Sequence, residues 1–396
     1  MIGDTFMQFL RTVIALVLTV TTLMPGIKAE DYDMPEAGHT SVLSGVDHNI
    51  KSAYLIEAST NTELYEMNSA EPCEIASVTK VMTLLLVMEA LEEERFKLDD
   101  TVYVSKNAAS MGGSQVYLEE GESITVEELI KCAVIASAND ASVALAELVS
   151  GSEELFVKKM NEKAGQLNLI NTYFENTTGL DDTTTNHHSC AKDVAAISRE
   201  LIKYDLILKY SSTWQDSIRG GEMTLTNTNR LIRYYDGCNG LKTGSTDKAG
   251  FCITVSAKRG DMKLIAVILG AKTKDDRNSA ARELLDYGFA NFTLFESKAG
   301  FLENTYVRGG KKDVAMLYTE GFSAVIDKSE GKVEEIYDIP EYLTAPIKSG
   351  DVVGKITYMI GDTVIGEADI YVEEDIEKTN LFDVAVRIIK KIIAGI

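Results

Sequence analysis

The sequence has 396 residues, of which 45% are hydrophobic and 25% charged, and its formal net charge is −22. A chain of this length and composition predicts a globular protein of about two domains and argues against disorder as its main state. The acidic excess argues against a nucleic-acid-binding protein, because binding phosphates requires a surface of Lys and Arg.

The first 29 residues have the pattern of a secretory signal peptide. An apolar stretch follows Arg11 and ends at Pro25-Gly26, and Ala29 provides a small residue at a cleavage point. The stretch is about a dozen residues long, which suits a signal peptide and is too short to span a membrane. A buried helix or an uncleaved anchor is the alternative. We therefore expect an exported protein with a signal peptide at residues 1–29.

Residues 30–298 are expected to form an α+β domain. Residue patterns predict strands at 53–57 and 63–67, a buried helix at 77–91, and two helices at 126–136 and 141–148. They also predict a hairpin with strands at 251–257 and 263–269, followed by a helix at 278–289. Strands at both ends of the region, with helices between them, favour an α+β architecture.

The remainder of the chain has a different character. Short β-type segments at 313–318, 322–326, 333–337, 352–359 and 363–372 predict a small all-β domain at residues 299–376. Residues 379–396 then predict an amphipathic helix, with Leu381, Ile388 and Ile392 on one face and Arg387 and Lys390 on the other. Such a helix suits the surface of an anionic membrane, although packing on the protein itself is the alternative.

The five cysteines form no C-x-x-C motif. Small buried thiols are the favoured interpretation, since a large exported domain with its own core does not need disulfides. A disulfide between Cys238 and Cys252 remains a possibility, because the two lie on either side of one motif described below.

Ser77 and Lys80 form a Ser-x-x-Lys motif at the start of the predicted buried helix. Residues at i and i+3 share a helix face, so the hydroxyl and the amine can meet. The helix N-terminus favours negative charge that develops at the serine. Burial should lower the pKa of Lys80, which makes it a candidate general base for Ser77. Alone, the motif equally fits a helix cap followed by a solvated lysine.

Two further motifs follow. Ser137-Ala138-Asn139 falls in the predicted turn between two helices, where Ser and Asn are common for reasons of turn geometry alone. Lys242-Thr243-Gly244-Ser245 leads into the predicted hairpin, where Gly allows close approach to the backbone and a strand edge can pair with a peptide. Lys242 would lower the pKa of Lys80 further if the two lysines lie close together. A basic turn before a hairpin is the alternative interpretation of this last motif.

Together, and in this order, the three motifs resemble the set found in penicillin-binding proteins and class A β-lactamases. Residues 75–83, 136–141 and 239–251 resemble the low-molecular-mass penicillin-binding proteins, which are the D-alanyl-D-alanine carboxypeptidases of serine peptidase family S11. The resemblance covers about residues 45–396. It implies a penicillin-binding/β-lactamase-like transpeptidase domain, followed by a small all-β domain and an amphipathic helix.

The resemblance also implies a role for each catalytic residue. Ser77 would be the acylated nucleophile and Lys80 the general base. Ser137 would relay protons to the leaving group, and Asn139 would hold the geometry.

Substrate binding is implied for Lys242, Thr243, Gly244, Ser245 and Arg277. Thr243 and Arg277 would hold the terminal carboxylate, and the backbone N–H groups of Ser77 and Ser245 would form the oxyanion hole. Several family members carry His where this chain has Ser245, a departure that affects a side chain and not the backbone donor.

The implied enzyme removes the terminal D-alanine of peptidoglycan stem peptides that end in D-Ala-D-Ala, uses no metal or cofactor, and is acylated by β-lactams. It would act at the outer face of the bacterial cytoplasmic membrane or in the cell wall.

Two other functions are the alternatives. A β-lactamase would need a glutamate that activates water, and Glu162 lies two residues away from the required spacing to Leu167-Asn168. A non-catalytic scaffold that binds the cell wall would not require the complete set of motifs. Zinc peptidases and Ser-His-Asp hydrolases are disfavoured, because the sequence contains no H-E-x-x-H and no G-x-S-x-G around Ser77.

Overall fold

A computed structural model describes residues 49–182 and 184–394 of the chain. The predicted signal peptide and the polar segment that follows it lie outside the described residues.

The catalytic-domain candidate is built on one antiparallel sheet in the order β2-β1-β9-β8-β7. Its strands are β1 (Ser52–Glu57), β2 (Glu63–Met67), β7 (Cys238–Thr246), β8 (Gly250–Arg259) and β9 (Met262–Ala271). Both predicted strand pairs are present, and the β8–β9 hairpin is longer than expected. In β9 every residue from Leu264 to Ala271 is buried, because layers cover both faces of the sheet.

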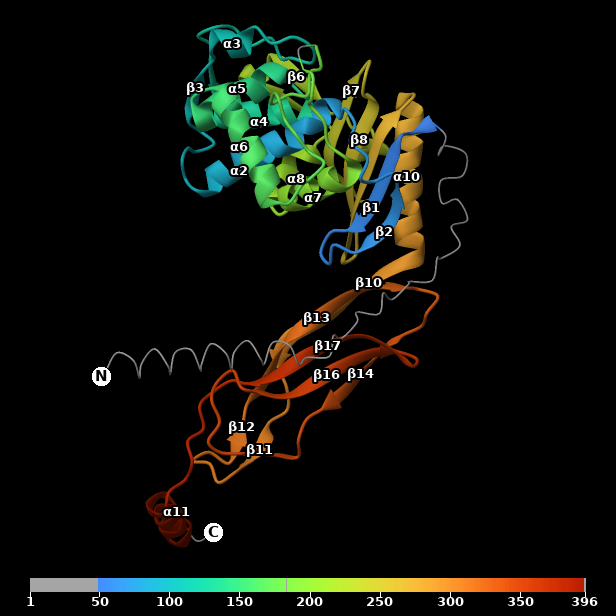
Figure 1. Cartoon of the computed structure of the whole chain (residues 1–396). Coiled ribbons are helices and arrows are strands. Elements are labelled where there is room, and N and C mark those ends of the chain that lie inside the picture. The colour runs from blue at the N-terminus through green and yellow to red at the C-terminus, as the bar shows by residue number, and fades with distance from the viewer. Residues whose placement is uncertain (1–48, 183, 395–396) are drawn as a thin grey trace, which may run out of the picture. The chain divides into compact units, whose positions relative to one another are not determined.

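Helices cover the two faces unequally. The helix α10 (Lys274–Asn291) packs against one face through Leu284 and Leu285. The other face carries the larger helical cluster, in which α7 (Ala191–Leu201) packs against β1 and β9 and α2 (Lys80–Glu92) packs on α7 (Figure 1). The nucleophile candidate therefore sits between the sheet and this cluster.

The remaining elements of this domain are short helices and two small hairpins. The helices are α3 (Lys106–Ala109), α4 (Val126–Ile135), α5 (Asn139–Ser150), α6 (Glu153–Gln166), α8 (Asp205–Ser211) and α9 (Leu231–Tyr234), with a 3-10 turn η3 (Arg219–Gly221). The hairpins pair β3 (Thr101–Tyr103) with β4 (Ser123–Thr125) and β5 (Gln215–Ile218) with β6 (Met223–Thr226).

One local expectation was wrong. Ser77 does not open an α-helix but lies in a 3-10 turn, η2 (Ala76–Thr79), and the α-helix begins at Lys80. Side chains at i and i+3 eclipse one another in a 3-10 turn, so the predicted contact between Ser77 and Lys80 survives the change.

The second domain, taken by itself, contains two sheets. The larger has the order β10-β13-β17-β16-β14 and the smaller β12-β11-β15. The strands are β10 (Phe292–Phe301), β11 (Thr305–Arg308), β12 (Val314–Ala315), β13 (Leu317–Asp327), β14 (Val333–Asp338), β15 (Tyr342–Thr344), β16 (Val352–Ile360) and β17 (Thr363–Val372). The fully buried Tyr358 stacks on Phe322 at 4.5 Å between ring centroids, which helps to form the core.

Two details differ from expectation. The segments predicted at 313–318 and 322–326 are joined, since β13 runs unbroken through the residues assigned to a turn. The strand β10 begins immediately after α10 ends at Asn291, so the boundary expected at residue 298 falls inside β10.

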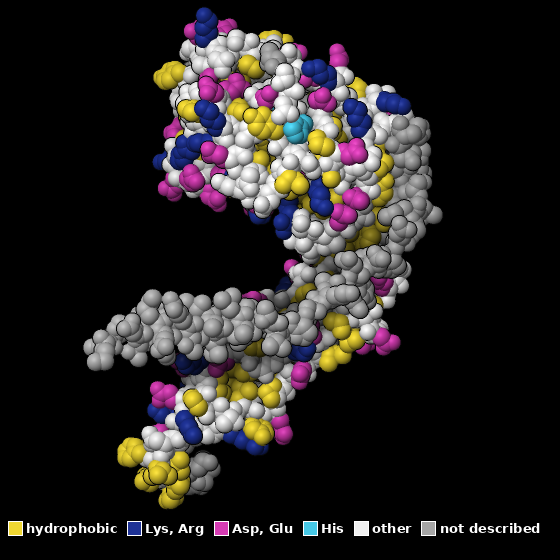
Figure 2. Space-filling model, in the orientation of Figure 1, with side chains coloured by type: hydrophobic (Ala, Val, Ile, Leu, Met, Phe, Trp, Pro, Cys, Tyr) yellow, Lys and Arg dark blue, Asp and Glu magenta, His cyan; other side chains and the backbone are white. Residues whose placement is uncertain are grey.

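The last helix, α11 (Leu381–Ala394), exposes its apolar side chains. Leu381, Phe382, Ile392 and Ile393 are 91%, 76%, 73% and 81% exposed, and Figure 2 shows hydrophobic side chains gathered on this helix. Among the described helices, none has both the length and the apolar character needed to cross a membrane.

All five cysteines are free thiols. Cys238 pairs with Ala257 and Cys252 with Gly244 across the β7–β8 ladder, so the two cysteines are not neighbours. The possible disulfide between them is absent.

Candidate active site

Lys80 meets Ser77 directly behind a pocket that Ser77 lines. Its Nζ lies 2.9 Å from Ser77 Oγ, 2.6 Å from Asn139 Oδ1 and 3.0 Å from the carbonyl oxygen of Thr178. The side chain of Lys80 is fully buried, whereas Ser77 is partly exposed and lines the pocket. Burial, followed by the charge of Lys242, holds the pKa of Lys80 well below its ordinary value.

The three partners of Lys80 suit a neutral amine. A neutral amine has two N–H donors and one lone pair, and Asn139 Oδ1 and the Thr178 carbonyl can only accept hydrogen bonds. When these two oxygens take the two N–H groups, the lone pair is left for the hydroxyl proton of Ser77. The arrangement therefore orients Lys80 to remove that proton.

Ser137 and Lys242 form a second pair beside the first. Lys242 Nζ donates to Ser137 Oγ and to the carbonyl oxygen of Thr243, both at 2.7 Å. Ser137, between α4 and α5, has a φ of +63°, a left-handed conformation that is uncommon for a residue with a side chain. Burial and then the charge of Arg277 lower the pKa of Lys242 to about 7.

Asn139 is the first residue of α5 and joins the motifs together. While its Oδ1 accepts from Lys80, its Nδ2 donates to the carbonyl of Gly112 at 2.7 Å. The next residue, Asp140, is buried and accepts backbone N–H bonds from Val116 and Leu118. Asn139 and Asp140 thereby fix the amine of Lys80 and the backbone at residues 116–118, close to the pocket.

Gly244 allows the nucleophile turn to press against β7. A Cβ at this position would lie 2.7 Å from the backbone nitrogen of Ser77 and 2.9 Å from the carbonyl oxygen of Ile75. Any larger residue would push Ser77 away from the strand. From the sequence, we expected this glycine to allow a ligand to approach the backbone. In the structure, it allows the backbone of the protein's own nucleophile turn to approach.

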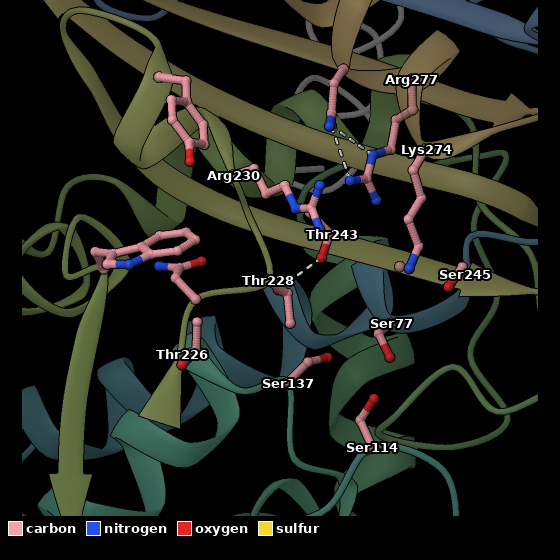
Figure 3. A pocket seen from close by; sticks show the side chains of 15 residues that line it. Ser77, Ser114, Ser137, Thr226, Thr228, Arg230, Thr243, Ser245, Lys274 and Arg277 are labelled. Atoms are coloured by element: carbon pink, nitrogen blue, oxygen red, sulfur yellow. Dashed lines mark hydrogen bonds between the residues drawn. The ribbon is translucent and has the colours of Figure 1, made fainter. Parts of the chain in front are cut away.

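The pocket has a volume of about 720 Å³ and is basic. Figure 3 shows Ser77 and Ser137 on one side of it and Arg230, Lys274 and Arg277 on the other. The described lining residues include no Asp or Glu. The full lining consists of Ser77, Ser114, Ser137, Trp214, Thr226, Asn227, Thr228, Arg230, Tyr234, Thr243, Gly244, Ser245, Lys274, Arg277 and Asn278.

Arg277 is the buried cation of this pocket. It is 5% exposed, and its guanidinium donates to the neutral side chain of Asn278 at 3.0 and 3.1 Å. Burial is the main cause that lowers the pKa of Arg277 to about 10. Thr243, whose Oγ1 donates to Thr228 Oγ1 at 2.8 Å, lines the same part of the pocket. The pair suits a bound carboxylate, which a guanidinium binds well.

A model of the D-alanyl-D-alanine carboxypeptidase family, Peptidase S11, matches residues 39–273. A second model, for the C-terminal domain of penicillin-binding protein 5, matches residues 289–378. The chain belongs to the D-alanyl-D-alanine carboxypeptidase family.

Relatives of this family member cover most of its length. D-alanyl-D-alanine carboxypeptidase DacF of Bacillus subtilis is 42% identical over 343 residues, which is 85% of this chain and 88% of the relative. Penicillin-binding protein 5 of Haemophilus influenzae has a similar structure, with a TM-score of 0.72, 30% identity, and coverage of 83% of this chain and 98% of that one. Penicillin-binding protein D2 of Listeria monocytogenes, in its ampicillin-bound form, has a TM-score of 0.56 at 30% identity and covers 61% of this chain and 98% of that one.

The structure of this carboxypeptidase-family member brings together all nine residues expected at the site. Ser77, Ser137, Thr243, Gly244, Ser245 and Arg277 line the pocket, and Lys80, Asn139 and Lys242 lie buried directly behind it. Ser245, at the position where some relatives carry His, is exposed at the rim.

Sequence reasoning missed one wall of the pocket and one partner of the base. Trp214 lies directly before β5, and Thr228, Arg230 and Tyr234 follow β6, in a stretch that carries no recognisable motif. The carbonyl of Thr178 bonds to Lys80 through its backbone, and a backbone group leaves no signal in residue identity.

Proposed function

We propose that this enzyme removes the terminal D-alanine from peptidoglycan stem peptides ending in D-Ala-D-Ala, through an acyl-enzyme on Ser77. The observation that carries the proposal is the placement of Lys80 Nζ, 2.9 Å from Ser77 Oγ, with two acceptors for its N–H groups. Family membership supports the same reaction, since the family model is that of D-alanyl-D-alanine carboxypeptidases.

Acylation begins when neutral Lys80 takes the hydroxyl proton of Ser77. The Oγ atom attacks the carbonyl carbon of the penultimate D-alanine, and the negative charge passes to the carbonyl oxygen, where the backbone N–H groups of Ser77 and Ser245 stabilise it. The C–N bond then breaks. The proton held by Lys80 passes through the hydroxyl of Ser137 to the leaving amine, and D-alanine departs.

Deacylation reverses the roles. Lys80, neutral again, takes a proton from a water molecule that attacks the ester carbon. The C–Oγ bond breaks, the proton returns to Ser77, and the shortened peptide leaves. Lys242 holds Ser137 in place throughout, because its amine donates to Ser137 Oγ at 2.7 Å.

The terminal carboxylate of the substrate binds to Arg277 and Thr243. A buried guanidinium whose partner in the described structure is the neutral Asn278 is costly, and an anionic ligand offsets that cost. The peptide extends along the outer edge of β7, which is the last strand of its sheet. No metal or cofactor is needed for any step of this scheme.

β-Lactams acylate the same serine. The relative solved with ampicillin supports this by similarity. The rival activity, rapid β-lactam hydrolysis, would need a glutamate that activates water, and Glu162 lies within α6 and outside the described pocket lining. The acyl-enzyme formed with penicillin is therefore expected to persist.

The enzyme acts outside the cytoplasm, at the outer face of the membrane or in the cell wall. The signal-peptide pattern of residues 1–29 supports export, and the exposed apolar side chains of α11 support attachment to a membrane surface.

The test uses the full mature chain and its Ser77→Ala variant. Incubation with penicillin should add one acyl group to the wild-type mass and none to the variant. A peptide ending in D-Ala-D-Ala should release D-alanine with the wild type alone. Rapid turnover of penicillin without release of D-alanine would identify a β-lactamase, and absence of both reactions in folded protein would identify a non-catalytic scaffold.

A further inference from the structure

Two lysines face each other across neighbouring strands, far from the pocket that holds Ser77. Lys258 of β8 and Lys263 of β9 are directly opposite in the antiparallel register. Directly opposed residues point to the same face of a sheet with their Cβ atoms about 5 Å apart. Both side chains are exposed, and within the described residues neither has a carboxylate partner. Like charges in this arrangement are destabilising unless an anion lies between them.

Two more cations approach the pair from the helical layer. Arg199 near the end of α7 and Lys203 in the following turn line one pocket with Lys258 and Lys263. The helix α7 is held to the sheet nearby, since Ser198 Oγ lies 2.8 Å from Thr254 Oγ1 of β8. The pocket has a volume of about 350 Å³ and shares no lining residue with the pocket of Ser77. We call these four cations and the cavity between them the basic pocket.

The carboxylates nearby offset only part of the positive charge of the basic pocket. Asp205 is the only acidic residue among its described lining. Glu200 bonds to Lys203 at 2.5 Å, and the carboxylate of buried Glu57 accepts from Thr60 and from the backbone of Lys263.

Within the described parts of the chain, Arg199 of the same pocket donates to the carbonyl oxygens of Ala58 and Ser59 and to no carboxylate. With Lys203 paired to Glu200, three cations and one carboxylate remain in the lining of the pocket. The pocket is therefore locally basic in a chain whose net charge is −22.

We propose that the basic pocket binds a phosphate group. A guanidinium and two ammonium groups approach from three separate elements, which suits the several acceptor oxygens of a phosphate. The cavity is large enough for such a group, carried by a phosphodiester polymer, by a lipid head group or by free phosphate. This site is independent of the proposed peptidase activity, since it uses none of the residues around Ser77.

Melting temperatures of lysine variants, measured without and with phosphate, test the proposal. In chloride at low ionic strength, Lys258→Gln and Lys263→Gln should each raise the melting temperature of the mature protein, because the repulsion between the two lysines is removed. With inorganic phosphate at about ten times its Kd and equal ionic strength, the wild type should gain about 2–4 °C, and both variants should gain much less. Lys106→Gln, which removes an exposed lysine elsewhere in the same domain, is the matched control.

Two further binding experiments distinguish the possible sources of the phosphate group. Binding of a soluble glycerol-phosphate oligomer and of phosphatidylglycerol vesicles is compared with protein that lacks residues 379–396, so that α11 cannot contribute. Loss of binding in Lys258→Gln in either arm supports the site and identifies its source. Equal phosphate gains in the wild type, both variants and Lys106→Gln would overturn the proposal, as would no gain in any of them. Penicillin acylation remains at the wild-type rate in these variants, so failure of this site is distinct from failure of the peptidase assignment.

Discussion

Lys242 lowers the pKa of Lys80 across the active site, although the two lysines come from different motifs and bond to different serines. Both are fully buried, so the charge of Lys242 disfavours the charged form of Lys80. One lysine thus helps to keep the other in the neutral form that acts as a base.

Replacing Lys242 by glutamine should move the pH dependence of acylation. Without the neighbouring charge, the pKa of Lys80 rises, so a higher pH is needed to keep it neutral. The acid limb of the penicillin acylation rate should shift to higher pH, apart from any loss of amplitude. Mass spectrometry of the acyl-enzyme between pH 5 and pH 10 measures the shift. Lys248→Gln, which removes an exposed lysine beyond the third motif, should leave the limb in place, and an unmoved limb in Lys242→Gln would contradict the coupling.

His187 positions the nucleophile turn. Its Nε2 lies 2.7 Å from Thr79 Oγ1, and its Nδ1 accepts from the backbone N–H of Glu175 at 3.1 Å. Thr79 belongs to the turn that carries Ser77, and the segment after Glu175 supplies the Thr178 carbonyl to Lys80. The imidazole therefore ties the nucleophile to the loop that orients its base.

His187→Leu should slow acylation by roughly 10–100-fold in folded protein, because small displacements of reacting groups have effects of that size. His188→Leu is the matched control, since that side chain is less buried and bonds to the local Asn186 carbonyl. Burial lowers the pKa of His187 to about 4, so its protonation is not expected to affect the rate near neutral pH. Equal rates in the two variants would remove the positioning role.

The same histidine should make stability depend on pH. The unfolded chain takes up a proton on His187 near pH 6.5, whereas the folded protein does so only near pH 4. The contribution of neutral His187 to the free energy of unfolding is fully present above about pH 6.5. It falls as the pH drops toward 4, by up to about 3 kcal/mol. Urea unfolding at pH 7.5 and pH 4.5 should show a smaller loss for His187→Leu than for the wild type. An identical loss in both proteins would show that His187 does not carry the effect.

The sequence predicted the catalytic side chains better than the groups that position them. Ser77, Lys80, Asn139 and Lys242 could be named in advance because their side chains do the chemistry, and their types and order are specific. The Thr178 carbonyl could not be named, since a backbone oxygen 98 positions away from Lys80 has no residue signature. The link between Thr79 and His187 spans 108 positions and depends on the tertiary fold.

Local structure was predicted less accurately where the tertiary structure overrides local pattern. The apolar run from Ser77 reads as one helix, but close packing of Gly244 and Gly179 against the nucleophile turn accompanies a 3-10 geometry there. In the second domain, Gly321 reads as a turn residue, yet it lies within β13 with a φ of +87°. A glycine can hold that conformation inside a strand, and the sequence alone does not distinguish the two cases.

Arg277 should determine selectivity for a free carboxylate. Arg277→Gln should raise KM for a peptide ending in D-Ala-D-Ala by about 10–100-fold, the value of one hydrogen bond to a charged group. The same peptide with a C-terminal amide lacks the charge, so its KM should change little. A steady-state comparison of the two peptides measures the discrimination. Arg282→Gln, on the same helix and outside the described lining of the Ser77 pocket, is the control, and retained discrimination in Arg277→Gln would exclude this residue as the carboxylate site.

The helix α11 should attach the enzyme to membranes through its apolar side chains. Ile388 and Ile392 are 54% and 73% exposed, and inserting one isoleucine into an apolar phase contributes about 1.5–3 kcal/mol. Full-length Ile388→Glu/Ile392→Glu should therefore lose at least about 100-fold in vesicle affinity, as measured by sedimentation with phosphatidylglycerol vesicles. Lys390→Gln should lose only about five-fold, and only on anionic vesicles, because one surface charge contributes about 1 kcal/mol. Both variants should release D-alanine from a soluble peptide at the wild-type rate. If the double variant binds vesicles with the affinity of the wild type, another part of the chain is responsible for membrane binding.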